Sequence, residues 1–223
     1  MRGVFVTGTG TEVGKTVVAA AIARTLAASG EGVAVFKPAV TGLDETTAEG
    51  LEADHELLRR ASSSTQREEE ISPYRYGPPM SPHLAAELAG ERIDPARLLA
   101  AARAAAEGAD ALVCEGVGGL LVPLAGAYLV RDLAVELRLP LVIAASPGLG
   151  TINHTLLTIE AARASGLEVI AVVLTPWPEH PSQIEESNRE TIAGLGDVRV
   201  ETLPALDLGG PGSWPALPLL PPR

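Results

Sequence analysis

The residues best suited to chemistry lie in a glycine-rich segment near the start of the chain, Gly8–Thr16. An apolar run precedes this segment and an Ala/Val-rich run follows it, which predicts a strand, a loop and a helix in succession. In such a loop, backbone N–H groups and the helix N-terminus converge on anionic oxygens. The Lys15 ammonium can reach the β- and γ-phosphates of a nucleotide, and the Thr16 hydroxyl can bind Mg²⁺. The segment therefore predicts a phosphate-binding loop, a variant with five residues between Gly8 and Gly14.

Two other charged residues each follow an apolar run of strand length. Glu115 follows Ala111–Cys114, and Lys37 follows Val33–Phe36. Because the carboxyl ends of parallel strands meet at the edge where ligands bind, we expect both side chains beside the glycine-rich loop. Magnesium sites of this kind use one or two carboxylates together with phosphate oxygens, which suits Glu115. A second cation at this edge would stabilise charge on a transferring phosphoryl group or on an acidic substrate.

Plainer interpretations of these residues stay open. Glu115 could be a solvated acid at a strand end, and Lys37 could be a surface residue. Against the second interpretation, Lys15 and Lys37 are the only lysines among the 17 Lys and Arg residues. A second acidic ligand could come from the acidic, turn-rich stretch Thr41–Pro82. Composition alone does not separate the candidates there, which are Asp44, Glu49, Glu52 and Asp54.

The elements that must position these residues alternate between strands and helices. The expected strands are Gly3–Thr7, Val33–Phe36, Ala109–Cys114, Leu141–Ala145, Glu168–Leu174 and Val198–Leu203. The expected helices are Thr16–Ala28, Pro95–Glu107, Leu129–Leu137, Thr151–Ala164 and Pro181–Ala193, with one more helical segment, Ala53–Ala61, in the polar stretch. This alternation predicts an α/β fold of the P-loop NTPase type, with a mostly parallel sheet covered by helices on both faces. We expect one domain over residues 1–206 and an irregular, Gly/Pro-rich tail over residues 207–223.

Composition excludes several classes of function. The net charge of −11 argues against a nucleic-acid partner, which needs a basic face. No apolar run reaches the length of a membrane span, and no signal peptide is visible, so we expect a cytoplasmic protein without a membrane partner. The single cysteine, Cys114, excludes a disulfide framework. Ser146 lacks the glycine-flanked turn of a serine hydrolase.

Five motifs, taken in chain order, resemble those of dethiobiotin synthetase. They cover roughly residues 3–175 and are Gly8–Thr16, Phe36–Pro38 with Thr41–Gly42, Ser81–His83, Val113–Gly119 and Leu149–His154. The resemblance implies an ATP-dependent ligase that acts on 7,8-diaminononanoate and CO₂. One amine takes up CO₂ to give a carbamate, ATP phosphorylates the carbamate, and the second amine closes the ring. Dethiobiotin, ADP and phosphate are the implied products, and a homodimer is the implied assembly.

The resemblance also implies roles for individual residues. Catalytic roles fall to Lys37, Lys15 and Thr11, and the ligands of Mg²⁺ would be Thr16, Asp54 and Glu115. Contacts with the nucleotide would come from Glu12, Val13, Gly14, Lys15, Thr16, Val17, Asp54, Glu115, Gly116, Val117, Gly118, Thr175, Pro204, Ala205 and Leu206. The substrate site would include Thr41, Ser81 and Gly118, with Leu149, Gly150 and Asn153 receiving the substrate carboxylate across the dimer interface. Gly148–Asn153 can equally be explained as an ordinary turn between a strand and a helix, with no role in binding.

The sequence departs from the family pattern where the base would bind. Thr175 stands in place of an asparagine that contacts adenine, and its single hydroxyl cannot present an amide's paired donor and acceptor. Ala205 replaces a common aromatic residue. Relaxed base selectivity is therefore expected.

A regulatory ATPase of the partitioning or septum-positioning type is the alternative, although such loops usually carry an extra lysine near the position of Gly10. An amide-forming ligase of the cobyrinate type is less favoured, because it would need a glutaminase domain.

Overall fold

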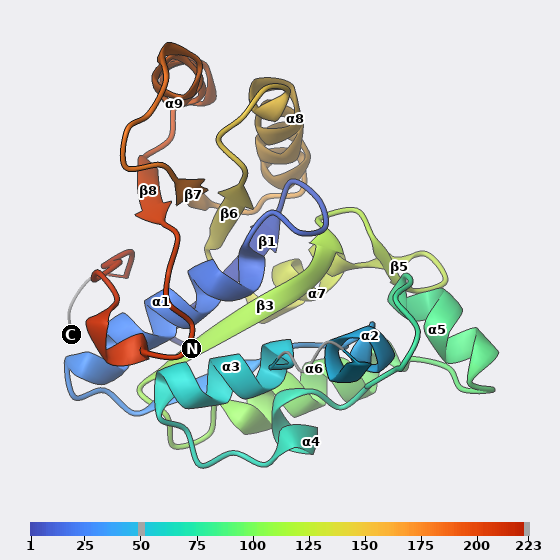
Figure 1. Ribbon diagram of the computed structural model, residues 1–223. Coiled ribbons are helices and arrows are strands. Elements are labelled where there is room, and N and C mark those ends of the chain that lie inside the picture. The colour runs from blue at the N-terminus through green and yellow to red at the C-terminus, as the bar shows by residue number, and fades with distance from the viewer. Residues whose placement is uncertain (49–51, 221–223) are drawn as a thin grey trace.

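The protein is built around a six-stranded sheet in the order β2-β3-β1-β6-β7-β8 (Figure 1). The computed structural model describes residues 1–48 and 52–220. The strands are β1 (Gly3–Gly8), β2 (Val33–Phe36), β3 (Ala111–Gly119), β6 (Leu141–Ala145), β7 (Val169–Trp177) and β8 (Val200–Pro204). Every neighbouring pair in this sheet is parallel, and a short antiparallel pair, β4 (Pro123–Ala125) with β5 (Tyr128–Leu129), lies outside it. The predicted α/β fold with a mostly parallel sheet is confirmed.

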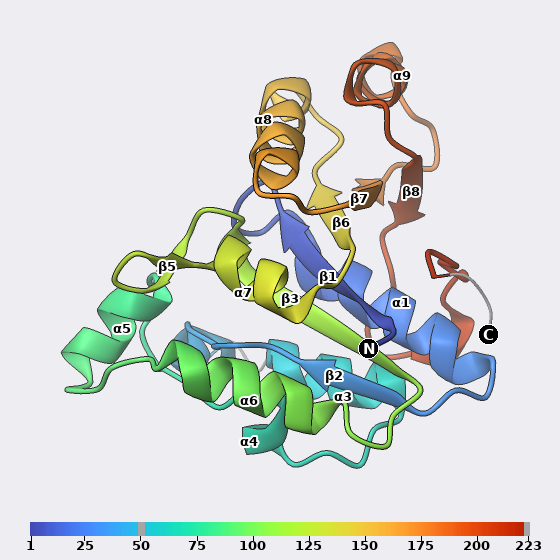
Figure 2. The same ribbon diagram turned by 180° about the vertical axis from the view of Figure 1, so that it is seen from behind.

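Helices cover both faces of the sheet, as the two opposite views show (Figures 1 and 2). One face packs against α1 (Lys15–Ala28) and α3 (Asp54–Ser62). The other face packs against α6 (Pro95–Ala105), α7 (Val130–Leu137), α8 (Thr151–Ala164) and α9 (Gln183–Gly196). This arrangement buries both sides of each strand, which explains why the strands are continuous apolar runs instead of alternating ones.

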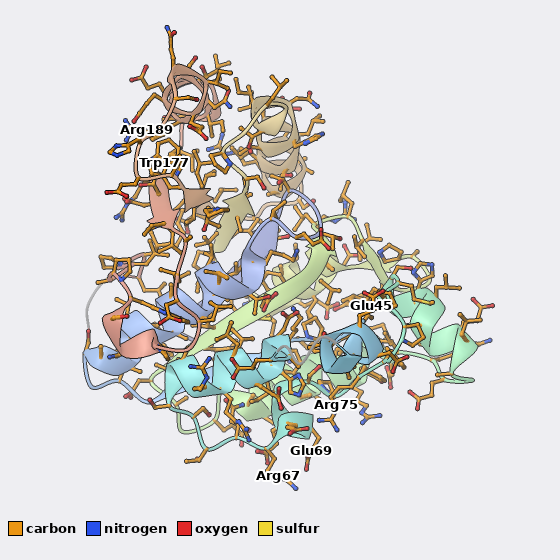
Figure 3. All side chains as sticks on the ribbon, in the orientation of Figure 1. Glu45, Arg67, Glu69, Arg75, Trp177 and Arg189 are labelled. Carbon is orange, nitrogen blue, oxygen red and sulfur yellow. The ribbon has the colours of Figure 1, made fainter. Side chains whose placement is uncertain are left out.

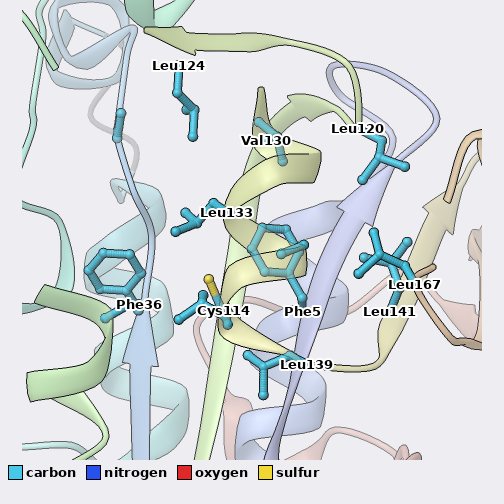
Figure 4. Close-up of a cluster of buried hydrophobic side chains, with 14 of the residues drawn as sticks. Phe5, Phe36, Cys114, Leu120, Leu124, Val130, Leu133, Leu139, Leu141 and Leu167 are labelled. Carbon is cyan, nitrogen blue, oxygen red and sulfur yellow. The ribbon is translucent and has the colours of Figure 1, made fainter. Parts of the chain in front are cut away.

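Alternate side chains of each strand supply the two core layers. In β1, Val4 and Val6 pack in the layer under α1, whereas Phe5 lies in the opposite layer. Figure 4 shows Phe5 in that second layer together with Cys114 of β3 and Leu141 of β6. Burial raises the pKa of the Cys114 thiol well above its ordinary value, so this side chain packs as a small apolar group.

The polar stretch between β2 and α6 contains more helix than predicted. One helical segment was expected there, at Ala53–Ala61, and α3 occupies that place. Three short helices are added to it: α2 (Leu43–Ala48), α4 (Glu68–Ile71) and α5 (Pro82–Leu88). Helices this short have no apolar period to detect in a sequence. Local caps and tertiary contacts hold them instead: in α4 the Glu70 carboxylate accepts from the Arg67 N–H at 2.8 Å, and Ile71 is fully buried.

The remaining predicted elements are present with altered ends. Strand β3 ends at Gly119 rather than Cys114 because Gly119 still pairs with Gly8 of β1. Strand β7 ends at Trp177 rather than Leu174 because Trp177 pairs with the end of β8. Helix boundaries shift by a few residues, as in α9, which is Gln183–Gly196 rather than Pro181–Ala193, and α6, which ends at Ala105 rather than Glu107. The longer strand ends lie at the edge where ligands are expected to bind.

The residues after β8 lie against α1 instead of extending into solvent (Figure 1). Up to residue 220 this segment contains one 3₁₀ turn, Pro211–Ser213, and is otherwise irregular. Leu217 and Leu219 are buried in the core layer under α1. Within residues 1–48 and 52–220, no helix has the length and apolar character needed to cross a bilayer.

We predict that Leu98→Ala lowers the free energy of unfolding by about 2–5 kcal/mol, because the side chain is fully buried between α6 and the sheet. The matched control is Leu88→Ala on α5, where Leu88 is 67% exposed and the expected change is within about 0.5 kcal/mol. Urea denaturation followed by circular dichroism measures both. Equal, small changes in the two variants would contradict the packing described here.

Candidate active site

The glycine-rich loop joins β1 to α1 and closes tightly over its own lysine. Gly14 caps the helix with φ +83°, a left-handed conformation that favours glycine. A Cβ atom at Gly8 would lie 2.6 Å from Val13 Cγ2 and 2.8 Å from Lys15 Cγ, so this loop conformation requires glycine at position 8. The Lys15 ammonium donates to the carbonyl of Gly10 at 2.8 Å. The loop therefore has the strand–turn–helix setting that its sequence predicts, with the positive end of the α1 dipole at its centre.

Four side chains from four elements meet beside this loop. Thr16 comes from α1, Lys37 follows β2, Asp54 begins α3 and Glu115 lies on β3. The Lys37 Nζ atom lies 2.5 Å from Asp54 Oδ2 and 2.6 Å from Glu115 Oε1. The Thr16 Oγ1 atom lies 2.9 Å from Asp54 Oδ1 and 2.9 Å from Glu115 Oε1. Because a hydroxyl has one hydrogen, Thr16 donates to one of the two carboxylates at a time.

The order of the strands explains why these groups meet. Strand β3 lies between β2 and β1, so Lys37 and the glycine-rich loop flank Glu115 on either side. Asp54, which only the family resemblance had singled out, reaches the same point because α3 packs over this side of the sheet. The structure thus brings together Lys37 and Glu115, which the strand ends indicated, and Asp54, which they did not.

The position of Lys37 also depends on a residue that sequence reasoning missed. Strand β2 is at the edge of the sheet, and its free side is occupied by the amide of Gln66. Gln66 Oε1 accepts from the Val35 N–H at 2.8 Å, and Gln66 Nε2 donates to the Val35 carbonyl at 3.1 Å. The Lys37 N–H donates to the Ile71 carbonyl at 2.8 Å. No sequence signal marks Gln66, because its partner lies 31 residues away in the chain.

The charges of the cluster depend on one another. Burial raises the pKa of Glu115, whose side chain has no exposed surface, and Lys37 opposes that rise without cancelling it. Burial also acts to raise the pKa of Asp54, but the Lys37 ammonium outweighs it and the pKa is lowered. For Lys37, burial alone would lower the pKa, yet the two carboxylates raise it above its ordinary value. Burial lowers the pKa of Lys15, with Glu115 acting in the opposite direction.

The oxygen atoms of the cluster fit a magnesium ion. Hydroxyl and carboxylate oxygens are the ligands that Mg²⁺ takes from proteins, with phosphate and water completing its shell. The Oε2 atom of Glu115 is buried without a hydrogen-bond partner, so one ligand position is free. Among the described residues, no group of three His, Cys, Asp or Glu side chains could hold a metal ion. A cation here would therefore need Thr16 and ligands from outside the protein, and it would compete with Lys37 for Asp54 and Glu115.

The other predicted residues differ in how exposed they are and in whether they lie near the cluster. The hydroxyl of Thr11 would lie 3.8 Å from a Cβ atom at Gly118, which has φ +61°, so the loop and the end of β3 lie side by side. Thr41 and Ser81 are half-buried. By contrast, Leu149, Gly150 and Asn153 lie exposed at the start of α8, and Leu149 is 96% exposed. Within the described residues, no hydrogen bond joins these three residues to the cluster.

The residues predicted near the base lie at the ends of β7 and β8. Thr175 is buried, and its Cγ2 atom would lie 2.5 Å from a Cβ atom at Gly14, so its methyl group packs on the phosphate loop itself. Trp177 pairs with Pro204, the first residue of the Pro204–Leu206 segment. The ring of Trp177 lies under the guanidinium of Arg189 on α9 at 5.9 Å, and the two residues lie together in Figure 3.

Known proteins with similar sequences show which family the chain belongs to. A family model described as an AAA domain matches residues 2–206. The chain is 47% identical over 174 residues to the ATP-dependent dethiobiotin synthetase BioD of Anaeromyxobacter dehalogenans (strain 2CP-1 / ATCC BAA-258), with 78% of this chain and 76% of the relative covered. It is 36% identical over 200 residues to the protein of the same name from Bacillus subtilis (strain 168), with 90% and 85% covered. With a phosphate loop, two lysines and two acids at one sheet edge, and with these relatives, the chain belongs to the dethiobiotin synthetase family.

Proposed function

We propose that this protein is a dethiobiotin synthetase, which uses ATP to carboxylate 7,8-diaminononanoate with CO₂ and to close a cyclic urea. The observation that carries the proposal is the convergence of Lys37, Asp54, Glu115 and Thr16 beside the glycine-rich loop. A loop that binds a triphosphate is common to many enzymes. A second buried lysine, 2.6 Å from a carboxylate at the same edge, is a more specific feature.

The reaction requires two anions to meet. An amine of the substrate attacks CO₂ and loses a proton, which leaves a carbamate anion. A carbamate oxygen then attacks the γ-phosphorus and displaces ADP, and the second amine attacks the carbonyl carbon and displaces phosphate. Carbamate and triphosphate repel each other, so the site must supply positive charge where they approach. Lys15 and Lys37 are both buried at this edge and would supply that charge, and Thr11 would orient the carbamate.

The nucleotide phosphates would lie on the loop residues Glu12, Val13, Gly14, Lys15, Thr16 and Val17, with Gly116, Val117 and Gly118 opposite. Thr16, Asp54 and Glu115 would hold Mg²⁺, which when bound supplies further positive charge to the β- and γ-phosphate oxygens. The same two carboxylates hold the Lys37 ammonium, so Lys37 and the ion would share them.

The substrate would bind between the cluster and a second subunit. Thr41, Ser81 and Gly118 would contact the substrate near Lys37, and the start of α8 would receive the substrate carboxylate. Exposed backbone N–H groups at a helix N-terminus suit that anion. Support for a homodimer comes from the apolar residues exposed around α8, Leu149 at 96% and Leu157 at 55%, which a partner subunit would cover.

We predict that ADP release requires both the diamine and bicarbonate, and that Lys37→Met lowers kcat by a factor on the order of 10²–10³, because it removes one cation from the phosphoryl-transfer step. A coupled assay of ADP release measures both effects. Arg92→Met, at an exposed residue between α5 and α6, is the control and should retain full activity. Undiminished dethiobiotin formation by a folded Lys37→Met variant would overturn the role given to Lys37.

A second prediction concerns the base. The methyl group of Thr175 packs against the phosphate loop, and its side chain has no amide to contact a base. We therefore expect kcat/KM for ATP to exceed that for CTP or GTP by less than about a hundredfold. Sites that hydrogen-bond to a base select it far more strongly than this. Steady-state kinetics with the three nucleotides measure the ratio, and a preference for ATP well above a hundredfold would show that another group contacts the base.

A further inference from the structure

The chain just after β8 is held by side chains that the proposed chemistry does not use. Asp207 and Leu208 lie in irregular backbone directly beyond Leu206. Trp214 Nε1 nevertheless donates to the Asp207 carbonyl at 2.7 Å, and Arg60 Nη2 donates to the Leu208 carbonyl at 2.6 Å. These two side chains act together with a local turn, in which the Gly210 N–H donates to the Asp207 carbonyl at 3.2 Å, to fix the path of the chain at this point.

Arg60 connects this path to the helix that carries Asp54. Its Nε and Nη2 atoms bond both carboxylate oxygens of Glu52, at 2.9 Å and 2.5 Å. Glu52 lies two residues before Asp54, so the guanidinium bridges the entrance of α3, its last turns and the Leu208 carbonyl. A planar guanidinium makes such a two-pronged bond in one fixed orientation, which a lysine cannot reproduce.

The rest of the segment is tied to α1, the helix that begins in the phosphate loop. The Leu217 N–H donates to the Thr25 hydroxyl at 2.8 Å, and Arg24 Nε donates to the Pro211 carbonyl at 3.3 Å. Leu217 is 4% exposed and packs with apolar residues of α1. Figure 1 shows this last part of the chain running beside α1. The segment thus contacts both helices whose first turns enter the candidate active site.

We propose that residues 207–220 form a brace that holds Pro204–Leu206 at a fixed position relative to the phosphate loop, and that Arg60 is the positioning residue of this brace. The inference rests on the proposed function, which assigns Pro204–Leu206 to the base of the nucleotide. A segment ordered before binding loses less conformational freedom when the ligand arrives. With Thr175 offering no amide to the base, the placement of this segment governs how well the base part of the nucleotide is held.

The test compares Arg60→Met with Arg67→Met. Arg67 lies on the far side of α3 from the brace, where it pairs with Glu69 and Glu70 of α4, as Figure 3 shows for Arg67 and Glu69. Isothermal titration calorimetry measures binding of ATP and of inorganic tripolyphosphate, which has the phosphates but no base. We expect Arg60→Met to weaken ATP binding about tenfold and to leave tripolyphosphate binding unchanged. Arg67→Met should change neither affinity, and Arg60→Lys should restore little of the loss.

A second variant tests the other tether. Trp214→Phe removes the N–H donor to Asp207 and keeps the aromatic ring, so it should weaken ATP binding selectively as well. If a variant lost affinity equally for ATP and tripolyphosphate, or for neither, the inferred role of the brace in nucleotide binding would be wrong. A lower midpoint of urea denaturation would not change that conclusion, because it reports only on stability. If the wild-type protein bound ATP but showed no diamine-dependent turnover, a selective loss in Arg60→Met would still support the brace while the proposed function failed.

Discussion

A lysine held between two carboxylates is the interaction on which the rest of this protein depends. Lys37 and Glu115 are buried at one edge of the sheet, where Lys37 also pairs with the partly exposed Asp54. A buried carboxylate without a counter-charge is strongly destabilising. The fold is therefore stable only if Lys37 lies beside the acids. Three strands, the start of α3 and the first turn of α1 are arranged so that they meet, and this arrangement also creates the phosphate loop beside them.

The same cluster accounts for how an acidic protein can bind acidic ligands. The chain carries a net charge of −11, yet both of its lysines are buried at the edge where the phosphate loop lies. Positive charge in a low-dielectric cleft acts more strongly than the same charge on the surface. Under the proposed function, Asp54 and Glu115 would also hold Mg²⁺, which would add to the positive charge at this edge.

Much of this site could be predicted from the sequence because each main group follows an apolar run. The loop, Lys37 and Glu115 all stand where a buried strand ends, and parallel strands end at one edge. Asp54 could not be chosen over its acidic neighbours on sequence alone. The structure separates two of them, since Glu52 pairs with Arg60 and Asp44 lies against Gly77, whereas Glu49 lies outside the described residues. The short helices α2 and α4, the Gln66 contact and the tethers of the last residues depend on distant partners, which no local pattern reveals.

Under the proposed function, the cluster supports carboxylation of a diamine at the expense of ATP. The most direct test is to incubate the protein with Mg²⁺, ATP, 7,8-diaminononanoate and ¹³C-labelled bicarbonate, and to analyse the product by mass spectrometry. We expect dethiobiotin containing one ¹³C atom per molecule, formed in a one-to-one ratio with ADP. ADP released without labelled product, or at the same rate without the diamine, would contradict it and would point to a nucleotide hydrolase instead.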